Sequence, residues 1–90
     1  MGRKLEDNIE PSVDESIFSA VIEERQNQVI KWGVQRHTIP EWLTILGEEY
    51  GEACKAGLDT HFDGPMTELR KELVQVMAVT LAIIEGIDST

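Results

Sequence analysis

The fold of this chain is decided by residues 73–84, which read LVQVMAVTLAII. Apolar side chains fill nearly every position of this stretch, and neither proline nor glycine interrupts it. Together with the flanking residues it predicts a helix over 66–87, because strand-like alternation of apolar and polar residues is lacking. A helix that is apolar almost all the way round is normally buried on most sides. The sequence therefore predicts a helix with packing partners on several faces.

A first helix is expected over residues 14–32, where apolar residues recur at helical spacing. Asp14 or Ser16 is a candidate N-cap for this helix, and Gly33 is a plausible stop. Residues 1–13 are polar and lack periodicity. We interpret them as a flexible N-terminal lead-in to a helical domain that spans residues 14–90.

A second helix is expected over residues 40–56. Pro40 suits its first turn, because an N–H group at that position has no partner within the helix. Gly57 is expected to end the helix, and residues 58–64 to form a loop. The chain is thus predicted to be all-α, with three main helices.

The small size of the chain predicts a homo-oligomer. A domain of 90 residues buries only ~60–65% of the surface that its unfolded chain exposes, so its core is marginal. Cys54 is the only cysteine, which excludes an intrachain disulfide, and we expect it to be a small core residue. Three short helices cannot surround residues 73–84. We therefore expect neighbouring copies, in a dimer or tetramer, to complete a four-helix-type bundle.

The charge balance restricts the ligands. With 17 acidic and 8 basic residues the formal net charge is −9, which argues against binding a nucleic acid polymer. An acidic protein can hold a phosphorylated ligand only if divalent cations lie between the carboxylates and the phosphates. The sequence contains no signal peptide and no apolar run long enough to span a bilayer, so we expect a cytoplasmic protein without a membrane partner.

Polar side chains interrupt the apolar faces of the second and third helices. Glu49 and Glu52 share one stripe, with Glu48 at its edge, while Glu72 and Gln75 share another. Residues three apart are neighbours on a helix, and like charges there repel. Burying carboxylates without partners is costly, and a divalent cation such as Mg²⁺, which prefers oxygen ligands, would offset that cost. The alternative is that these positions are solvated or paired with lysines of another subunit.

Two of these segments resemble the motifs of a known family. Residues 48–52 read EEYGE and match the EExxE motif of the all-alpha nucleotide pyrophosphohydrolases, which include MazG-like proteins and dimeric dUTPases. That family carries ExxD on the next helix, where residues 72–75 of this chain read ELVQ. Residues 24–26 (ERQ) and 31–33 (KWG) also resemble the first helix of small MazG-like proteins. The resemblance covers about residues 15–87.

The resemblance implies a helical bundle that is completed by a second subunit. It also implies hydrolysis of a nucleoside triphosphate to the monophosphate and pyrophosphate, with Mg²⁺ as cofactor and Mn²⁺ as a possible substitute. Glu49, Glu52 and Glu72 match the metal-ligand glutamates of the family. Glu48 matches the remaining motif glutamate, and we assign it to orienting or deprotonating the attacking water. Gln75 stands where the family has aspartate.

Gln75 leaves three interpretations open. The metal site works with three glutamates, or Glu68, one turn earlier on the same stripe, supplies a fourth carboxylate. The third is that activity is low or lost. The chain would then be a catalytically weak or inactive MazG-like helical oligomer that serves as a nucleotide-binding or protein-interaction module. Glutamine also occurs here in other small MazG-like sequences, which favours a tolerated variant.

Four residues of the first helix are candidates for substrate binding. Lys31 and Arg25 are candidates to approach the phosphates, although each is equally well explained as a surface charge. Trp32 is a candidate to stack on the base, and Gln28 to hydrogen-bond its edge. Packing in the core or at an interface is the more common role of a tryptophan at helical spacing.

Three further residues, Trp42, His37 and His61, have side chains that can contact a ligand. Trp42 is a second candidate to stack on a base, with the same packing alternative. His37 and His61 fall in predicted connections and lack the paired spacing of a zinc site. We therefore expect both histidines to be surface residues.

Overall fold

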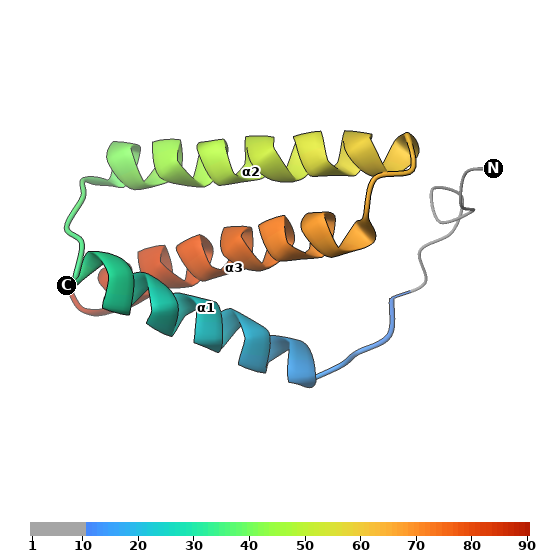
Figure 1. Cartoon of the computed structure of the whole chain (residues 1–90). Coiled ribbons are helices and arrows are strands. Elements are labelled where there is room, and N and C mark those ends of the chain that lie inside the picture. Colours follow the sequence, from blue (N-terminus) through green and yellow to red (C-terminus); the bar gives the residue numbers. More distant parts are fainter. Residues whose placement is uncertain (1–10) are drawn as a thin grey trace.

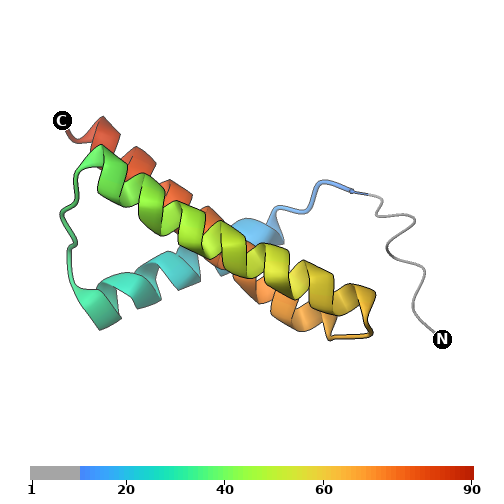
Figure 2. The same ribbon diagram turned by 90° about the horizontal axis from the view of Figure 1, so that it is seen from above.

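The computed structural model describes residues 11–90, and this part of the chain is helical without strands. Its helices are α1 (Ser16–Trp32), α2 (Ile39–His61) and α3 (Met66–Asp88). α3 packs against both α2 and α1 and lies between them (Figure 1). α2 and α3 run side by side, and α1 crosses them at an angle (Figure 2). The prediction of an all-α chain with three helices is confirmed.

The start of α1 differs slightly from the prediction. Glu15 occupies the N-cap position and makes no side-chain capping bond. Asp14 lies one residue earlier, where its carboxylate accepts hydrogen bonds from the backbone N–H (3.0 Å) and the hydroxyl (2.7 Å) of Ser16. Of the predicted lead-in, residues 1–10 lie outside the described residues, and residues 11–13 are not helical.

Gly33 ends α1 as predicted. Its φ of 74° lies in the left-handed region that favours glycine, and its N–H donates to the Val29 carbonyl over 2.8 Å. The positive φ of Gly33 lets the chain leave α1 and turn towards the start of α2.

A capping box starts α2. The Glu41 N–H donates to the Thr38 hydroxyl over 3.3 Å, and the Thr38 N–H donates to the Glu41 carboxylate over 2.7 Å. Pro40 lies in the first turn, as predicted. The prediction that Gly57 ends this helix is wrong, because α2 continues to His61. Gly57 is half-buried opposite Leu69 of α3, and packing against α3 outweighs the low helix propensity of glycine.

The connection between α2 and α3 is shorter than predicted and covers residues 62–65. Asp63 adopts a positive φ of 66°. The Gly64 N–H donates to the Asp59 carbonyl over 2.7 Å, and a Cβ at Gly64 would lie 2.7 Å from the same oxygen. Only glycine fits this close approach.

The core of the described chain contains only small side chains. No residue larger than valine is buried, while Phe18 is 59% and Ile84 48% exposed. Cys54 is exposed on α2, so the prediction of a core position is wrong. No helix in residues 11–90 is long and apolar enough to cross a membrane. The buried core residues are Val21, Ala53, Ala56, Ala78, Val79 and Ala82.

Candidate metal centre

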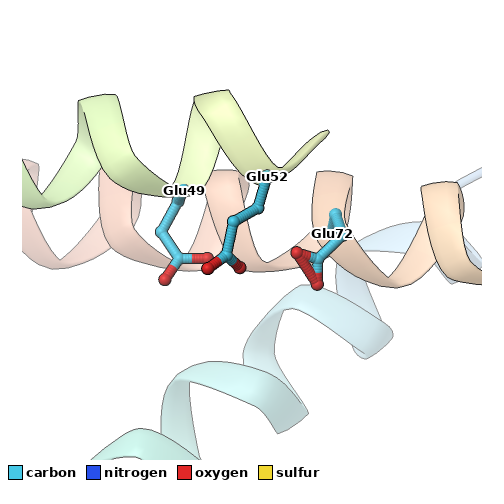
Figure 3. A group of neighbouring side chains, drawn as sticks. All are labelled: Glu49, Glu52 and Glu72. Carbon is cyan, nitrogen blue, oxygen red and sulfur yellow. The ribbon is translucent and has the colours of Figure 1, made fainter. Parts of the chain in front are cut away.

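Three glutamates from two helices meet in the structure. Glu49 and Glu52 lie one turn apart on α2, and Glu72 lies on α3. One carboxylate oxygen from each residue lies within 4.8 Å of the other two. The three carboxylates gather on the side of the α2–α3 pair that faces α1 (Figure 3). The structure thus brings together the three glutamates that the sequence predicted as metal ligands.

Small residues allow the two helices to present these carboxylates to one another. Ala53 follows Glu52 on α2 and is buried, and Ala78 and Val79 are buried on α3. Short side chains let helices approach closely, which brings longer side chains at the edge of the contact within reach of each other. Glu49 is half-buried, with one carboxylate oxygen, Oε2, buried and without a hydrogen-bond partner in the described residues.

Electrostatic repulsion is concentrated on Glu49. Burial raises the pKa of Glu49, and the negative charges of Glu52, Glu24 and Glu48 raise it further. Glu24 lies on α1, so all three helices contribute negative charge to this region. Unpaired buried carboxylates are rare because no ion pair or hydrogen bond offsets the free energy of removing their charge from water.

Glu72 has the same electrostatic signature. Burial is the largest cause that raises the pKa of Glu72. Hydrogen bonding with Glu52 and the negative charges of Glu52 and Glu49 raise this pKa further, while the positive charge of Lys71 lowers it. No basic side chain forms an ion pair with the cluster in residues 11–90, where the single ion pair joins Arg25 and Glu85. The cluster therefore favours either a proton or a cation.

The donor set fits a hard divalent cation. Mg²⁺ binds oxygen ligands at ~2.0–2.1 Å, so ligands on opposite sides of the ion lie about 4.2 Å apart. Neighbouring ligands of such an ion lie about 3 Å apart, and one oxygen from each glutamate lies within 4.8 Å of the other two. Side-chain rotation of Glu49, Glu52 and Glu72 would bring the carboxylates to one ion, and the buried oxygen of Glu49, which has no hydrogen-bond partner in residues 11–90, is one candidate ligand atom.

The other predicted members of the centre lie around this group. Glu48 is exposed and outside it, although its charge reaches Glu49. Gln75 is half-buried on α3, one turn after Glu72, and its role stays a prediction. Glu68 is exposed and does not join the three glutamates.

Glu24 is the carboxylate that sequence reasoning missed. It is half-buried on α1, and its charge acts on Glu49 of α2. Glu24 lies seven residues after Ile17 and three after Val21, on the apolar side of α1, but unlike Glu49 and Glu52 it has no second carboxylate three residues away to mark it. Its proximity depends on the angle at which α1 crosses the other two helices.

The predicted substrate-binding residues divide into two pairs. Arg25 and Gln28 line a cavity of about 440 Å³, where the Arg25 guanidinium pairs with the Glu85 carboxylate over 2.8 Å. Lys31 and Trp32 do not line that cavity. Both are exposed, and the Lys31 ammonium lies 4.8 Å from the centre of the Trp32 ring.

The two histidines have different environments. His37 packs edge-to-face against Trp42, with ring centres 4.7 Å apart, and both residues line the same cavity. His37 is half-buried and so less exposed than the predicted surface position, and its Nε2 atom is buried and lacks a hydrogen-bond partner within residues 11–90. His61 is exposed as predicted, although it is the last residue of α2 rather than part of a connection.

Comparisons with known proteins identify no relative. No protein-family model, no curated protein and no solved structure matches this chain. The resemblance to MazG-like proteins thus consists of the motifs in residues 24–33, 48–52 and 72–75. A function for the chain therefore depends on its site residues.

Proposed function

We propose that this protein is a Mg²⁺-dependent nucleoside triphosphate pyrophosphohydrolase, which converts a ribo- or deoxyribonucleoside triphosphate and water to the monophosphate and pyrophosphate. One observation carries the proposal: Glu49, Glu52 and Glu72 converge from two helices, with oxygens within 4.8 Å of one another and no ion pair to a basic side chain in residues 11–90. The match of residues 48–52 to the EExxE motif supports the same reaction.

Each site residue has a distinct task in this reaction. Glu49, Glu52 and Glu72 would hold the divalent cation, and Gln75 is placed one turn after Glu72 to add a neutral oxygen. A bound cation would neutralise phosphate charge and acidify a water molecule. Glu48, exposed beside Glu49, would orient the attacking water and accept its proton.

We also propose that the working form is a homo-oligomer, a dimer or tetramer. α1 and α3 form an apolar groove of about 330 Å³, lined by Phe18, Ile22, Met77 and Ile84 among others. These four side chains are 40–59% exposed, while only alanine and valine are buried in the described chain. A second copy is the occupant favoured here, because symmetric self-association is the common way to complete a small core.

The activity test compares three proteins: the wild type, Glu49→Gln and the control Glu23→Gln. Glu23 is exposed on α1 and outside the glutamate cluster. Pyrophosphate release is measured for a panel of canonical and damaged nucleoside triphosphates with Mg²⁺, Mn²⁺ or EDTA. We expect metal-dependent release by the wild type and the control. Glu49→Gln should lose more than the ~10–100-fold that loss of a group hydrogen-bonded to a metal ligand costs. Equal activity in all three proteins would contradict the proposal.

Gln75 favours a second candidate function, an inactive helical oligomer that binds nucleotides or another protein. An amide brings no charge to the cation, so the site holds one anion fewer than the family pattern. If the wild type releases no pyrophosphate, Gln75→Asp is the informative variant. Release by Gln75→Asp would identify the wild type as an inactive member of the proposed class. Inactivity of both proteins would favour the binding module.

A further inference from the structure

A small packed surface holds α1 to the rest of the bundle. This helix packs on α3, and within the described chain Val21 is the only residue of α1 that is buried. Its larger apolar side chains include Phe18, Ile22 and Ile30, which are 47–82% exposed. A segment with few buried apolar contacts opens at a lower free energy than the core of its domain. Of the three helices, α1 is therefore the one that detaches most easily.

One ion pair fastens α1 to α3. The Arg25 guanidinium donates to the Glu85 carboxylate over 2.8 Å. The two side chains are 24% and 49% exposed, so water and salt screen the pair only in part. No other ion pair joins two helices within residues 11–90. Beyond the packing around Val21, the attachment of α1 therefore depends on Arg25 and Glu85.

Repulsion at the residue before Arg25 opposes this attachment. Glu24 lies one turn after Val21 on the same side of α1 and is half-buried. It forms no ion pair in the part of the chain that the structure describes, and its negative charge acts on Glu49 of α2. Like charges repel each other, so Glu24 disfavours the position of α1 that Arg25 stabilises.

α1 lies across the glutamate cluster, which consists of Glu49, Glu52 and Glu72. The three carboxylates point to the side of α2 and α3 along which α1 passes (Figure 3). α1 ends at Gly33, whose φ of 74° favours glycine, and residues 34–38 are not helical. A short connection of this kind can absorb the backbone rotation that a moving helix requires.

We propose that α1 is a lid over the glutamate cluster, hinged at Gly33 and latched by the ion pair between Arg25 and Glu85. The inference rests on the proposed function, since opening of the lid admits the triphosphate to the cluster. The latch favours the closed lid, and repulsion between Glu24 and Glu49 favours the open one. The balance of these two interactions sets the fraction of molecules in which the site is accessible.

Amide hydrogen exchange of the full-length protein in EDTA, measured by NMR, tests the lid. A helix of 17 residues is only marginally stable in water once it is detached, so opening exposes its amides. We expect the amides of residues 20–30 to exchange together, at least tenfold faster than the central amides of α2 and α3. Uniform protection of all three helices would overturn the proposal, because α1 would then open only when the whole domain unfolds.

Exchanging the two charges of the ion pair tests the latch. Arg25→Glu places like charges at the contact and should speed exchange in α1 at least fivefold relative to α2. Adding Glu85→Arg restores the pair with its charges exchanged, and should return the rate to within about twofold of the wild type. A double variant that exchanges as fast as Arg25→Glu would refute the latch, because a loss of packing is not repaired by a second charge.

Glu24→Gln tests the opposing repulsion, because it removes the charge and keeps the size of the side chain. α1 of this variant should exchange about two- to fivefold more slowly than α1 of the wild type. Glu23→Gln is the matched control and should leave the rates unchanged, because Glu23 is exposed and is not among the charges that act on Glu49. Equal slowing in both variants, or none in Glu24→Gln, would contradict the role of Glu24.

The lid and the proposed reaction fail separately, because exchange in EDTA requires neither metal nor nucleotide. Separate opening of α1, with rescue by the exchanged charges, in a protein that releases no pyrophosphate would refute the enzyme and support the lid. Pyrophosphate release by a protein whose three helices exchange uniformly would support the enzyme and refute the lid.

Discussion

Ionisation of Glu49 destabilises the folded protein, and this effect depends on pH. Its pKa is raised above the ordinary value of 4.5 by burial first and then by the charges of Glu52, Glu24 and Glu48. The folded chain therefore binds this proton more tightly than the unfolded chain. The stability that this proton binding adds to the fold is fully present below the pKa of Glu49 in the unfolded chain. It is lost as pH rises through the pKa of Glu49 in the folded chain. Near neutral pH the ionised Glu49 destabilises the metal-free fold.

Replacement of Glu49 by glutamine should relieve this cost. We expect metal-free Glu49→Gln to melt a few degrees above the wild type at pH 7, with the difference shrinking as pH falls towards 4. Thermal unfolding followed by circular dichroism in EDTA measures the effect, and Glu23→Gln serves as the exposed control. A lower Tm for Glu49→Gln than for the wild type at pH 7 would show that the carboxylate has a stabilising partner. Glu41 and Asp14, whose pKa values are lowered by hydrogen bonds, are common to all three proteins.

The sequence identified the charged residues of the site better than its uncharged ones. Glu49, Glu52 and Glu72 were predictable because they interrupt apolar stripes at helical spacing, a pattern visible without coordinates. The buried nitrogen of His37 was not predictable. A histidine in a connection has no periodicity, and its burial depends on how the α1–α2 connection folds over Trp42.

At the scale of elements, Gly64 and Gly86 differ in whether the structure has room for a side chain. A Cβ at Gly64 would lie 2.7 Å from the Asp59 carbonyl oxygen, in the turn between α2 and α3. Gly86 lies inside α3 and has no atom within 4 Å of the position of an added Cβ. One glycine is thus required by close contact, while the other only weakens its helix.

Alanine at each position should reveal this difference. Gly64→Ala should destabilise the protein by more than ~1 kcal/mol, because backbone must move to relieve the contact. Gly86→Ala should stabilise it by up to ~1 kcal/mol, the difference in helix propensity between the two residues. Urea unfolding gives both free energies. Equal effects of the two substitutions would contradict the structure of the α2–α3 turn.

Helix ends were predictable where local chemistry decides them. The Gly33 stop and the Pro40 start depend on backbone constraints of single residues, and both occur as expected. Gly57 shows the limit of such rules. The half-buried glycine stays helical because α2 continues to pack on α3, and that contact between distant residues is not encoded in the local sequence.

At the scale of the whole molecule, the single chain leaves large apolar side chains uncovered. Phe18 and Ile84 are each about half exposed in the groove between α1 and α3, although the described core holds nothing larger than valine. The sequence predicted three helices and an incomplete core. The groove that α1 and α3 form was not predictable, because it depends on the crossing angle of α1 (Figure 2).

A charge in this groove should weaken self-association. We expect the wild type to sediment as a dimer or tetramer, and Phe18→Asp to shift towards smaller species by at least tenfold in the association constant. Leu58→Asp is the control, because Leu58 is 60% exposed on α2 and does not line the groove. Analytical ultracentrifugation measures both. A wild type that sediments as a monomer at all concentrations would refute the homo-oligomer.

The metal centre at Glu49, Glu52 and Glu72 is tested most directly by calorimetric titration of the metal-free protein with Mn²⁺, beside Glu49→Gln and Glu23→Gln. We predict saturable binding to the wild type and to Glu23→Gln, and an affinity at least tenfold weaker for Glu49→Gln, because one of the three carboxylates then lacks its charge. Equal Mn²⁺ binding by all three proteins, or none by the wild type, would contradict a metal centre at these glutamates.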